Sequence, residues 1–160
     1  MSLVPDSSGR PLFAFDVEAA DSTTGARAGT FTTAHGPIRT PVFMPVGTRA
    51  TVKGMHPTHL EELGAQVLLA NAYHLFLRPG ADIVRRAGGL HSFMGWDRAI
   101  LTDSGGFQIF SLADTLEVTD HGVRFRSIVD GARHFWSPED NMALQQDLGA
   151  DIVMQLDQCP

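Results

Sequence analysis

Two short stretches share one order of residues and constrain the fold more than any other feature of the chain. EELGAQVLLAN (61–71) and QDLGADIVMQLD (146–157) both end a helical pattern at Leu-Gly-Ala and continue through a polar residue into an apolar run. Glycine after the last helical turn is typical of a helix end, and a continuous apolar run is typical of a strand covered on both faces. Repeated joints of this kind predict an α/β fold with a parallel sheet, either doubly wound or a (β/α) barrel.

The segment before residue 47 has a different character. Residues 12–46 are rich in Thr, Phe and Val, and they predict a small antiparallel β element that turns at HGP (35–37). Within it, PVFMPVG (41–47) predicts a short apolar strand, and residues 1–11 read as a flexible tail. A chain of 160 residues can bury one core, so we expect a single domain over 12–160.

The elements expected beyond residue 47 alternate between helix and strand. They are helices at 55–64, 79–89 and 137–150, buried strands at 66–71, 99–102 and 151–157, a hairpin turning at 120–122, and an extended piece at 132–137. Because three of these strands end in a polar residue, the polar side chains are the first candidates for a site. They are Asn71, Asp103 and Asp157. In parallel α/β folds the carboxyl ends of the strands open on one side, where active sites lie, so we expect the three to meet there.

The stretch LTDSGGFQ (101–108) adds detail to that site. Gly105 and Gly106 lack a Cβ, so either a ligand or a tight turn of the backbone can approach closely. Phe107 could stack on a ligand and Gln108 could bind its edge; alternatively the glycines form an ordinary turn and Phe107 belongs to the core. The residues alone leave both interpretations open.

Other motifs carry weaker signals. His56 and His59 have a spacing that can bind metal, but HPTH also reads as a helix start and no third ligand is evident. His74 could act as a base, although packing against Tyr73 is the simpler interpretation. Neither a phosphate-binding P-loop nor a GxGxxG pattern is present, so no nucleotide cofactor is expected.

Composition narrows the class of protein. The chain is 43% hydrophobic and 19% charged, which fits a globular fold, and it has no apolar run long enough to cross a membrane. The single cysteine, Cys159, excludes an internal disulfide framework and favours a cytoplasmic location. The net charge of −6 disfavours nucleic-acid binding when taken alone.

Five ordered segments, from about residue 27 to the end, resemble the tRNA-guanine transglycosylases, also called the queuine tRNA-ribosyltransferase family. GWDR before LTDSGGFQ and MQLDQC after LGAD are especially specific. The segments are HGPIRTPVFMPVGTRATVKGMHP, LLANAYHLFLRPG, GGLHSFMGWDRAILTDSGGFQIFSL, GVRFRSIVDGARHFWSPE and LGADIVMQLDQCP.

The resemblance implies a role for each matching residue. Asp103 would be the general acid/base beside the exchanged base, and Asn71 would orient it. Asp157 would accept hydrogen bonds from the Watson–Crick edge of guanine, a role that suits an acceptor-only carboxylate. The loop lining the base pocket would comprise Ser104, Gly105, Gly106, Phe107 and Gln108, with Phe107 stacking on the base and Cys159 lying nearby.

The resemblance also implies a reaction and its partners. Guanine at the wobble position of the tRNA anticodon loop would be exchanged for a 7-deazaguanine through a covalent glycosyl-enzyme intermediate, after the base is turned out of the loop. The fold would be the N-terminal portion of a (β/α)8 TIM-type barrel, preceded by the antiparallel element. The full-length parent would form a homodimer, act in the cytoplasm and have no contact with a membrane.

The chain departs from the family pattern in several respects. The attacking aspartate, a Gly-rich loop and the zinc site of three cysteines and a histidine belong to later family segments, so we expect no metal or cofactor in this segment and no exchange by the isolated chain. The basic surface that binds tRNA would also belong to those later segments. The net charge of −6 in this chain is therefore no objection to tRNA as a substrate of the family. Ala72 stands where the family usually has threonine.

Two alternatives remain besides a transglycosylase fragment. One is a non-catalytic accessory or binding module that keeps the base pocket, and the other is a (β/α) hydrolase half that uses Asp103 and Asp157 on a small substrate. The incoming base could be a queuine precursor, queuine or the archaeal analogue, with Cys159 favouring the bacterial type.

Overall fold

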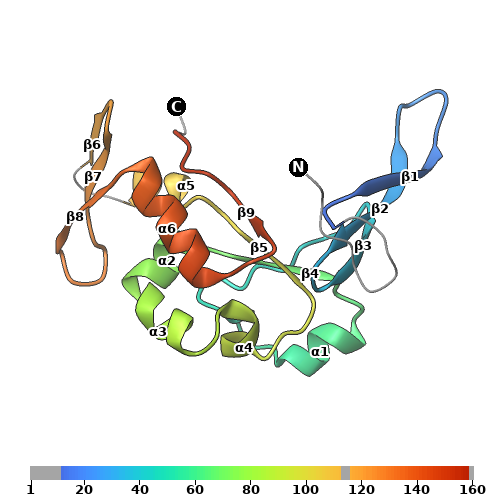
Figure 1. Ribbon diagram of the computed structural model, residues 1–160, viewed down its shortest axis with the longest axis horizontal. Helices are drawn as coiled ribbons and strands as arrows, with labels where there is room; N and C mark the ends of the chain where they lie inside the picture. The colour runs from blue at the N-terminus through green and yellow to red at the C-terminus, as the bar shows by residue number, and fades with distance from the viewer. Residues whose placement is uncertain (1–11, 113–115, 159–160) are drawn as a thin grey trace.

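The computed structural model describes residues 12–112 and 116–158, which form three three-stranded sheets with helices packed around the middle one (Figure 1). The sheets lie in a row: the antiparallel sheet β1–β3 at one end, the parallel sheet β4-β5-β9 in the middle, and the antiparallel sheet β6–β8 at the other end (Figure 1). The tail expected at 1–11 and Cys159 fall outside the described residues.

The first sheet confirms the predicted antiparallel element. It contains β1 (Phe15–Ala20), β2 (Arg27–Thr33) and β3 (Gly36–Thr40), and the β2–β3 pairing closes at Thr33 opposite Gly36. The prediction of a strand at 41–47 is wrong, because within this segment only Val46 pairs with a strand, in a single bridge to Leu69. Prolines 41 and 45 have no N–H to donate, so they cannot extend a ladder.

The middle sheet confirms the parallel arrangement that the repeated joints predict. Strands β4 (Val67–Ala70), β5 (Ala99–Thr102) and β9 (Ile152–Val153) run parallel and lie side by side in chain order. The Val46–Leu69 bridge is also parallel, so the neighbour order continues without reversal on the other side of β4. An order that follows the chain is expected of a (β/α) barrel, and it also occurs within each half of a doubly wound sheet.

The strand predicted at 151–157 is shorter than expected. Only Ile152–Val153 is strand, and the main chain of Asp151 and Met154 adds one hydrogen bond to β5 on each side. β5 itself ends at Thr102, where the chain turns into the Asp103–Ser104 loop. Past that point residues 155–157 have no neighbouring strand with which to pair, although they remain near the loop.

The predicted helices are present, together with three that the sequence did not reveal. The expected ones are α1 (Pro57–Glu62), α3 (Ala81–Arg86) and α6 (Pro138–Leu148). The additional ones are α2 (Ala72–Leu77), α4 (Leu90–Met94) and α5 (Gly106–Leu112). Each additional helix has at most seven residues, a length at which tertiary contacts rather than intrinsic propensity decide helix formation.

The start of helix α6 could be predicted because it carries a complete capping motif. The Ser137 hydroxyl accepts a hydrogen bond from the Asp140 N–H, and the Asp140 carboxylate accepts one from the Ser137 N–H. This reciprocal capping, with Pro138 in the first turn, satisfies N–H groups that the helix cannot pair internally. Gly149 ends the helix in the left-handed conformation, with φ of 67°.

The third sheet confirms the predicted hairpin and extended piece. It consists of β6 (Leu116–Thr119), β7 (Gly122–Arg126) and β8 (Arg133–Trp136), all antiparallel. Its inner face, with Val123, Phe125 and Trp136 buried, packs against the main core. That core also contains Trp96 and Ile100, which are fully buried. Burial of each such side chain stabilises the fold by about 1.5–3 kcal/mol.

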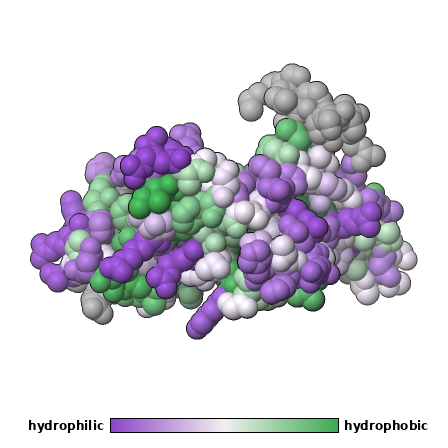
Figure 2. Space-filling view, turned by 90° about the horizontal axis from the view of Figure 1, so that it is seen from below, coloured by the Kyte–Doolittle hydropathy of each residue, from purple (hydrophilic) through white to green (hydrophobic). Residues whose placement is uncertain are grey.

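The surface of the described residues is not uniformly polar. Figure 2 shows apolar patches between polar groups on one face. Phe43 is 81% exposed, and Val46, Val153 and Met154, which lie at or beside the outer strands of the parallel sheet, are exposed as well. None of the helices in the described part of the chain has the length and apolar character needed to span a membrane.

Candidate active site

Asp103 lies directly after β5 and is held by two donors. Its Oδ2 accepts a hydrogen bond of 2.5 Å from Asn71 Nδ2, and its Oδ1 accepts one of 2.8 Å from the Ala72 N–H. The predicted contact between Asn71 and Asp103 is therefore confirmed. The carboxylate also caps the first turn of α2, so its direction is fixed by two elements, β4 and α2, at once.

Ser104 connects this group to the second carboxylate. The Ser104 hydroxyl donates to Asp157 Oδ1 and accepts a 3.0 Å hydrogen bond from the Gly106 N–H. Ser104 is buried, whereas Asp157 is exposed and Asp103 is half-buried. The three strand-end residues thus lie at one end of the parallel sheet, where Asn71 bonds Asp103 and Ser104 bonds Asp157.

The two glycines allow this convergence. Gly105 has φ of +79°, and a Cβ there would lie 3.0 Å from Trp136 and 3.2 Å from Tyr73. At Gly106 a Cβ would lie 2.4 Å from the main-chain oxygen of Asp157. Of the two interpretations of these glycines, the structure supports the tight turn: Gly105 makes it, and Gly106 lets the Asp157 segment approach.

Phe107 and Gln108 lie in the first turn of α5. Phe107 is 63% exposed, so the interpretation that placed it in the core is wrong, and its ring is free to stack on a planar group. Gln108 is half-buried, and its Oε1 has no hydrogen-bond partner among the described residues. Beside this turn is a hollow of about 160 Å³ lined by α5, the β6–β7 hairpin, Leu156 and Asp157, but not by Asp103.

Two buried amides on α6 brace the loop from behind, and the sequence analysis missed both. Gln145 Nε2 donates to the Asp103 carbonyl oxygen at 2.7 Å, and Asn141 Nδ2 donates to the Ser104 carbonyl oxygen at 2.7 Å. They are 1% and 0% exposed. Their spacing of four residues puts them on one helix face with Leu144 and Leu148. A pair of amide residues within an otherwise apolar helix face is the sequence signal that could have predicted them.

His74 lies near Asp103 and packs edge-on against Tyr73, with 5.3 Å between ring centroids. Burial lowers the pKa of His74, and the positive charge of Arg49 lowers it further, although Asp103 acts in the opposite direction. The expected packing against Tyr73 is confirmed, and the imidazole is neutral near pH 7.

Comparison with known proteins identifies the family. The model of the family described as queuine tRNA-ribosyltransferase matches residues 21–160. The chain belongs to this family. A queuine tRNA-ribosyltransferase from Moorella thermoacetica is 61% identical over 149 residues, and one from Desulforudis audaxviator is 59% identical over 145 residues. The alignments cover 93% and 91% of this chain, but only 40% and 39% of the two relatives. The chain therefore spans about two fifths of the length of the relatives it matches.

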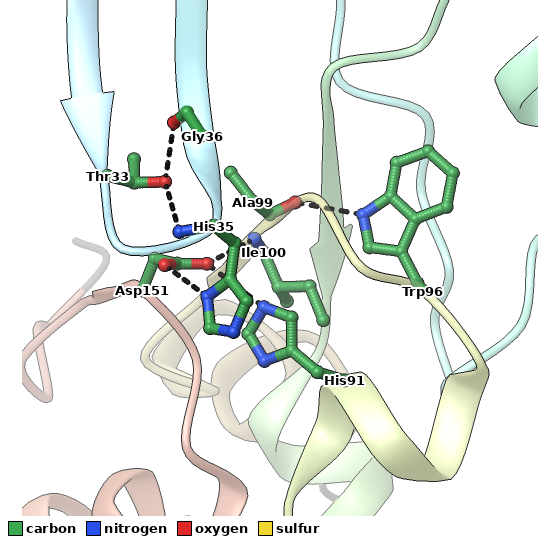
Figure 3. Close-up of polar contacts among 8 residues, drawn as sticks. All are labelled: Thr33, His35, Gly36, His91, Trp96, Ala99, Ile100 and Asp151. Carbon is green, nitrogen blue, oxygen red and sulfur yellow. Dashed lines mark hydrogen bonds and ion pairs between the residues drawn. The ribbon is translucent and has the colours of Figure 1, made fainter. Parts of the chain in front are cut away.

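This member of the queuine tRNA-ribosyltransferase family has a second polar cluster, at the opposite ends of the same strands (Figure 3). Asp151, just before β9, accepts hydrogen bonds from His35 Nδ1 at 2.7 Å, His91 Nε2 at 3.0 Å and the Ile100 N–H at 2.9 Å. Its side chain is fully buried. Burial alone raises the pKa of Asp151, but the hydrogen bonds from His91, His35 and Ile100 outweigh it and lower the pKa to about 2.

We name these three side chains the His–Asp–His joint, because they connect the β2–β3 turn, α4 and the start of β9. The imidazole rings are stacked, with centroids 3.5 Å apart and planes 14° apart (Figure 3). Their in-plane lone pairs therefore lie in two nearly parallel planes 3.5 Å apart, an arrangement that does not favour a metal ion shared by both rings. The other histidine pair, His56 and His59, forms the capping box of α1.

Proposed function

We propose that this chain provides the base-recognition and proton-transfer part of a tRNA-guanine transglycosylase, which exchanges guanine at the wobble position of tRNA for a 7-deazaguanine. The observation that carries the proposal is the placement of Asp103 and Asp157 beyond the carboxyl ends of the neighbouring strands β5 and β9, with Asn71 bonded to Asp103 and Ser104, the next residue, bonded to Asp157. Membership of the queuine tRNA-ribosyltransferase family supports the same reaction.

Asp157 is suited to recognise the base. Guanine and its 7-deaza analogues present adjacent N–H and amino donors on the Watson–Crick edge, and a carboxylate offers only acceptors. Ser104 holds one oxygen of Asp157, which fixes the plane of the carboxylate toward such an edge. Phe107, exposed on the same loop, would stack on the ring, while Gln108 would bind its periphery.

Asp103 is suited to move the proton that accompanies exchange. When guanine leaves the ribose its ring nitrogen must gain a proton, and the incoming base must lose one. Both Asp103 oxygens have donors, so the carboxylate is presented in one orientation rather than several rotamers. Ser104, Gly105 and Gly106 would shape the pocket between this group and Asp157.

The covalent step would use a carboxylate outside this chain. A glycosyl-enzyme intermediate requires a nucleophile on the ribose face opposite the departing base. We propose that the parallel sheet continues into a (β/α) barrel in a longer protein, consistent with the exposed Phe43, Val46, Val153 and Met154 at its outer strands. The isolated chain would then bind a base without exchanging it.

The third sheet offers a surface for the RNA. Arg126 and Arg133 lie directly opposite each other on β7 and β8, and neither has an ion-pair partner among the described residues. Like charges in such positions destabilise a sheet unless an anion lies between them. With His134 and with Arg124, which is ion-paired to Glu117, they line a hollow of about 300 Å³, and we propose that the two facing arginines receive a tRNA phosphate there.

Two asparagine variants test the proposal in the complete enzyme. Asp157→Asn introduces an amide donor, so guanine affinity should fall by about 10–100-fold. Asp103→Asn should leave affinity within about threefold but lower the incorporation of labelled guanine into tRNA by about 10²-fold or more. Asp147→Asn, on the exposed side of α6, is the control. Unchanged guanine affinity in Asp157→Asn would remove that residue from recognition, and base binding with no exchange by the unmodified complete protein would favour the accessory module.

A further inference from the structure

Gln145 bonds the carboxyl ends of both strands that lead to the carboxylates. Its Nε2 donates to the carbonyl oxygens of Asp103, at 2.7 Å, and of Met154, at 3.2 Å. Its Oε1 accepts a 2.5 Å hydrogen bond from the Thr102 hydroxyl. Thr102 is the last residue of β5, Asp103 directly follows it, and Met154 directly follows β9.

These contacts use the amide nitrogen as a donor and the carbonyl oxygen as an acceptor. A glutamine amide has two N–H donors and one carbonyl acceptor, and here each donor faces a main-chain oxygen while the acceptor faces a hydroxyl. Glutamate of the same shape has no donor when ionised, and leucine has neither donor nor acceptor. Because Gln145 is buried, water cannot replace the missing partners at low cost.

The strands need such a connection at this point. The β5–β9 ladder pairs only Leu101 with Ile152 and Thr102 with Val153, and no strand pairing continues beyond it. Asp103 follows that last pair by one residue and Asp157 by four. Beyond the ladder, the three hydrogen bonds of Gln145 and the Ser104–Asp157 hydrogen bond join the two segments through side chains.

We propose that Gln145 is a positioning residue that sets the separation of Asp103 and Asp157, and so controls the chemical step rather than binding of tRNA. This inference rests on the proposed function of those two carboxylates. Gln145 contacts neither side chain; it holds the main chain of Asp103 and the segment that leads from Met154 to Asp157. Small displacements of catalytic groups lower rates strongly while leaving distant binding contacts intact.

The decisive variants are Gln145→Leu and Gln145→Glu, with two controls. Gln146→Leu makes the same change one position away on the exposed face of α6. Leu148→Ala removes buried apolar volume from the same helix face, so it reproduces a loss of stability without touching the strand ends. Urea denaturation places the variants on one stability scale, so that kinetic effects can be compared at temperatures where all are folded.

In the complete enzyme, Gln145→Leu should lower kcat for guanine exchange by about tenfold or more and change the KM for tRNA by less than about twofold. Both controls should keep kcat within about twofold. Gln145→Glu should be as slow as Gln145→Leu at pH 8 and recover part of its rate at pH 6, since a protonated carboxyl can again donate to the Asp103 oxygen. Equal kcat in Gln145→Leu and Leu148→Ala would overturn the proposal.

Hydrogen exchange on the 160-residue chain tests the inference independently of activity. The Asp103 N–H bonds the Ala70 oxygen and the Met154 N–H bonds the Thr102 oxygen, each at 3.1 Å. In Gln145→Leu the protection factors of these two amides should fall by about tenfold more than the loss of global stability accounts for. In Leu148→Ala they should fall only by the amount that the loss of global stability accounts for. If the unmodified complete enzyme fails to exchange guanine, the proposed function fails. If protection at these amides is unchanged, Gln145 does not position the strand ends.

Discussion

Replacing Asp151 by asparagine tests how much the His–Asp–His joint stabilises the fold. The hydrogen bonds on Asp151 lower its pKa from 3.8 to about 2. Each unit of pKa shift corresponds to about 1.4 kcal/mol, so the ionised side chain contributes about 2 kcal/mol to the free energy of unfolding near neutral pH. Asparagine keeps one acceptor but turns an N–H₂ group toward one of the three donors, so the loss should reach about 2–3 kcal/mol.

The contribution has a defined dependence on pH. Because the folded pKa lies below the unfolded one, the stabilisation is fully present above about pH 4 and is lost as pH falls through about 2. Roughly half of it should remain at pH 3. The difference in unfolding free energy between the unmodified chain and Asp151→Asn should therefore be about equal at pH 7 and 5 and shrink below about pH 4.

Urea denaturation of both proteins at pH 7, 5 and 3 measures this difference. A loss of about 2–3 kcal/mol should also lower the melting temperature by roughly 5–10 °C for a chain of this size. Asp147→Asn, whose carboxylate is 41% exposed and lies 3.6 Å from Arg85, is the matched control and should change stability by less than about 0.5 kcal/mol. A loss below 1 kcal/mol in Asp151→Asn, or one that does not shrink with acidity, would contradict the reasoning.

Two further predictions concern the site loop and the RNA surface. Gly106→Ala should destabilise the chain by about 1–3 kcal/mol in urea and weaken guanine binding, because its Cβ would lie 2.4 Å from the Asp157 oxygen; unchanged values in both assays would contradict the packing argument. Combined Arg126→Glu and Arg133→Glu should lower the tRNA affinity of the complete enzyme by about tenfold at low salt and reduce the salt dependence by the equivalent of one to two phosphate contacts. Arg85→Glu, on α3, is the control, and an equal effect there would indicate nonspecific charge repulsion.

The parts of the fold that could be predicted are those whose signals are local. The Ser137–Asp140 cap marks the start of α6, and the Leu-Gly-Ala joints mark where helices end and buried strands begin. β5 lies at 99–102, as expected, because its apolar run is bounded by polar residues on both sides. The strand order required the structure, but a parallel sheet followed from the repeated joints alone.

The parts that could not be predicted depend on residues distant in sequence. Helix α5 begins at Gly106, a residue of low helix propensity, because Ser104 and the Asp157 segment hold its first turn. The His–Asp–His joint combines positions 35, 91 and 151, with no shared local pattern. Gln145 shares a helix face with Asn141, Leu144 and Leu148, which separates it from the exposed Gln146, but its contacts with two strand ends required the structure.

The two polar clusters act on the same short strand from opposite ends. β5 has only four residues, and the Ile100 N–H near its start bonds Asp151, while the Thr102 hydroxyl and the Asp103 carbonyl at its end bond Gln145. A strand this short has few ladder hydrogen bonds with which to resist sliding, so side chains that bond its backbone at both ends determine where it stops. We therefore expect the position of the Asp103 carboxylate to depend on the joint at the far end of the strand as well as on Asn71 beside it.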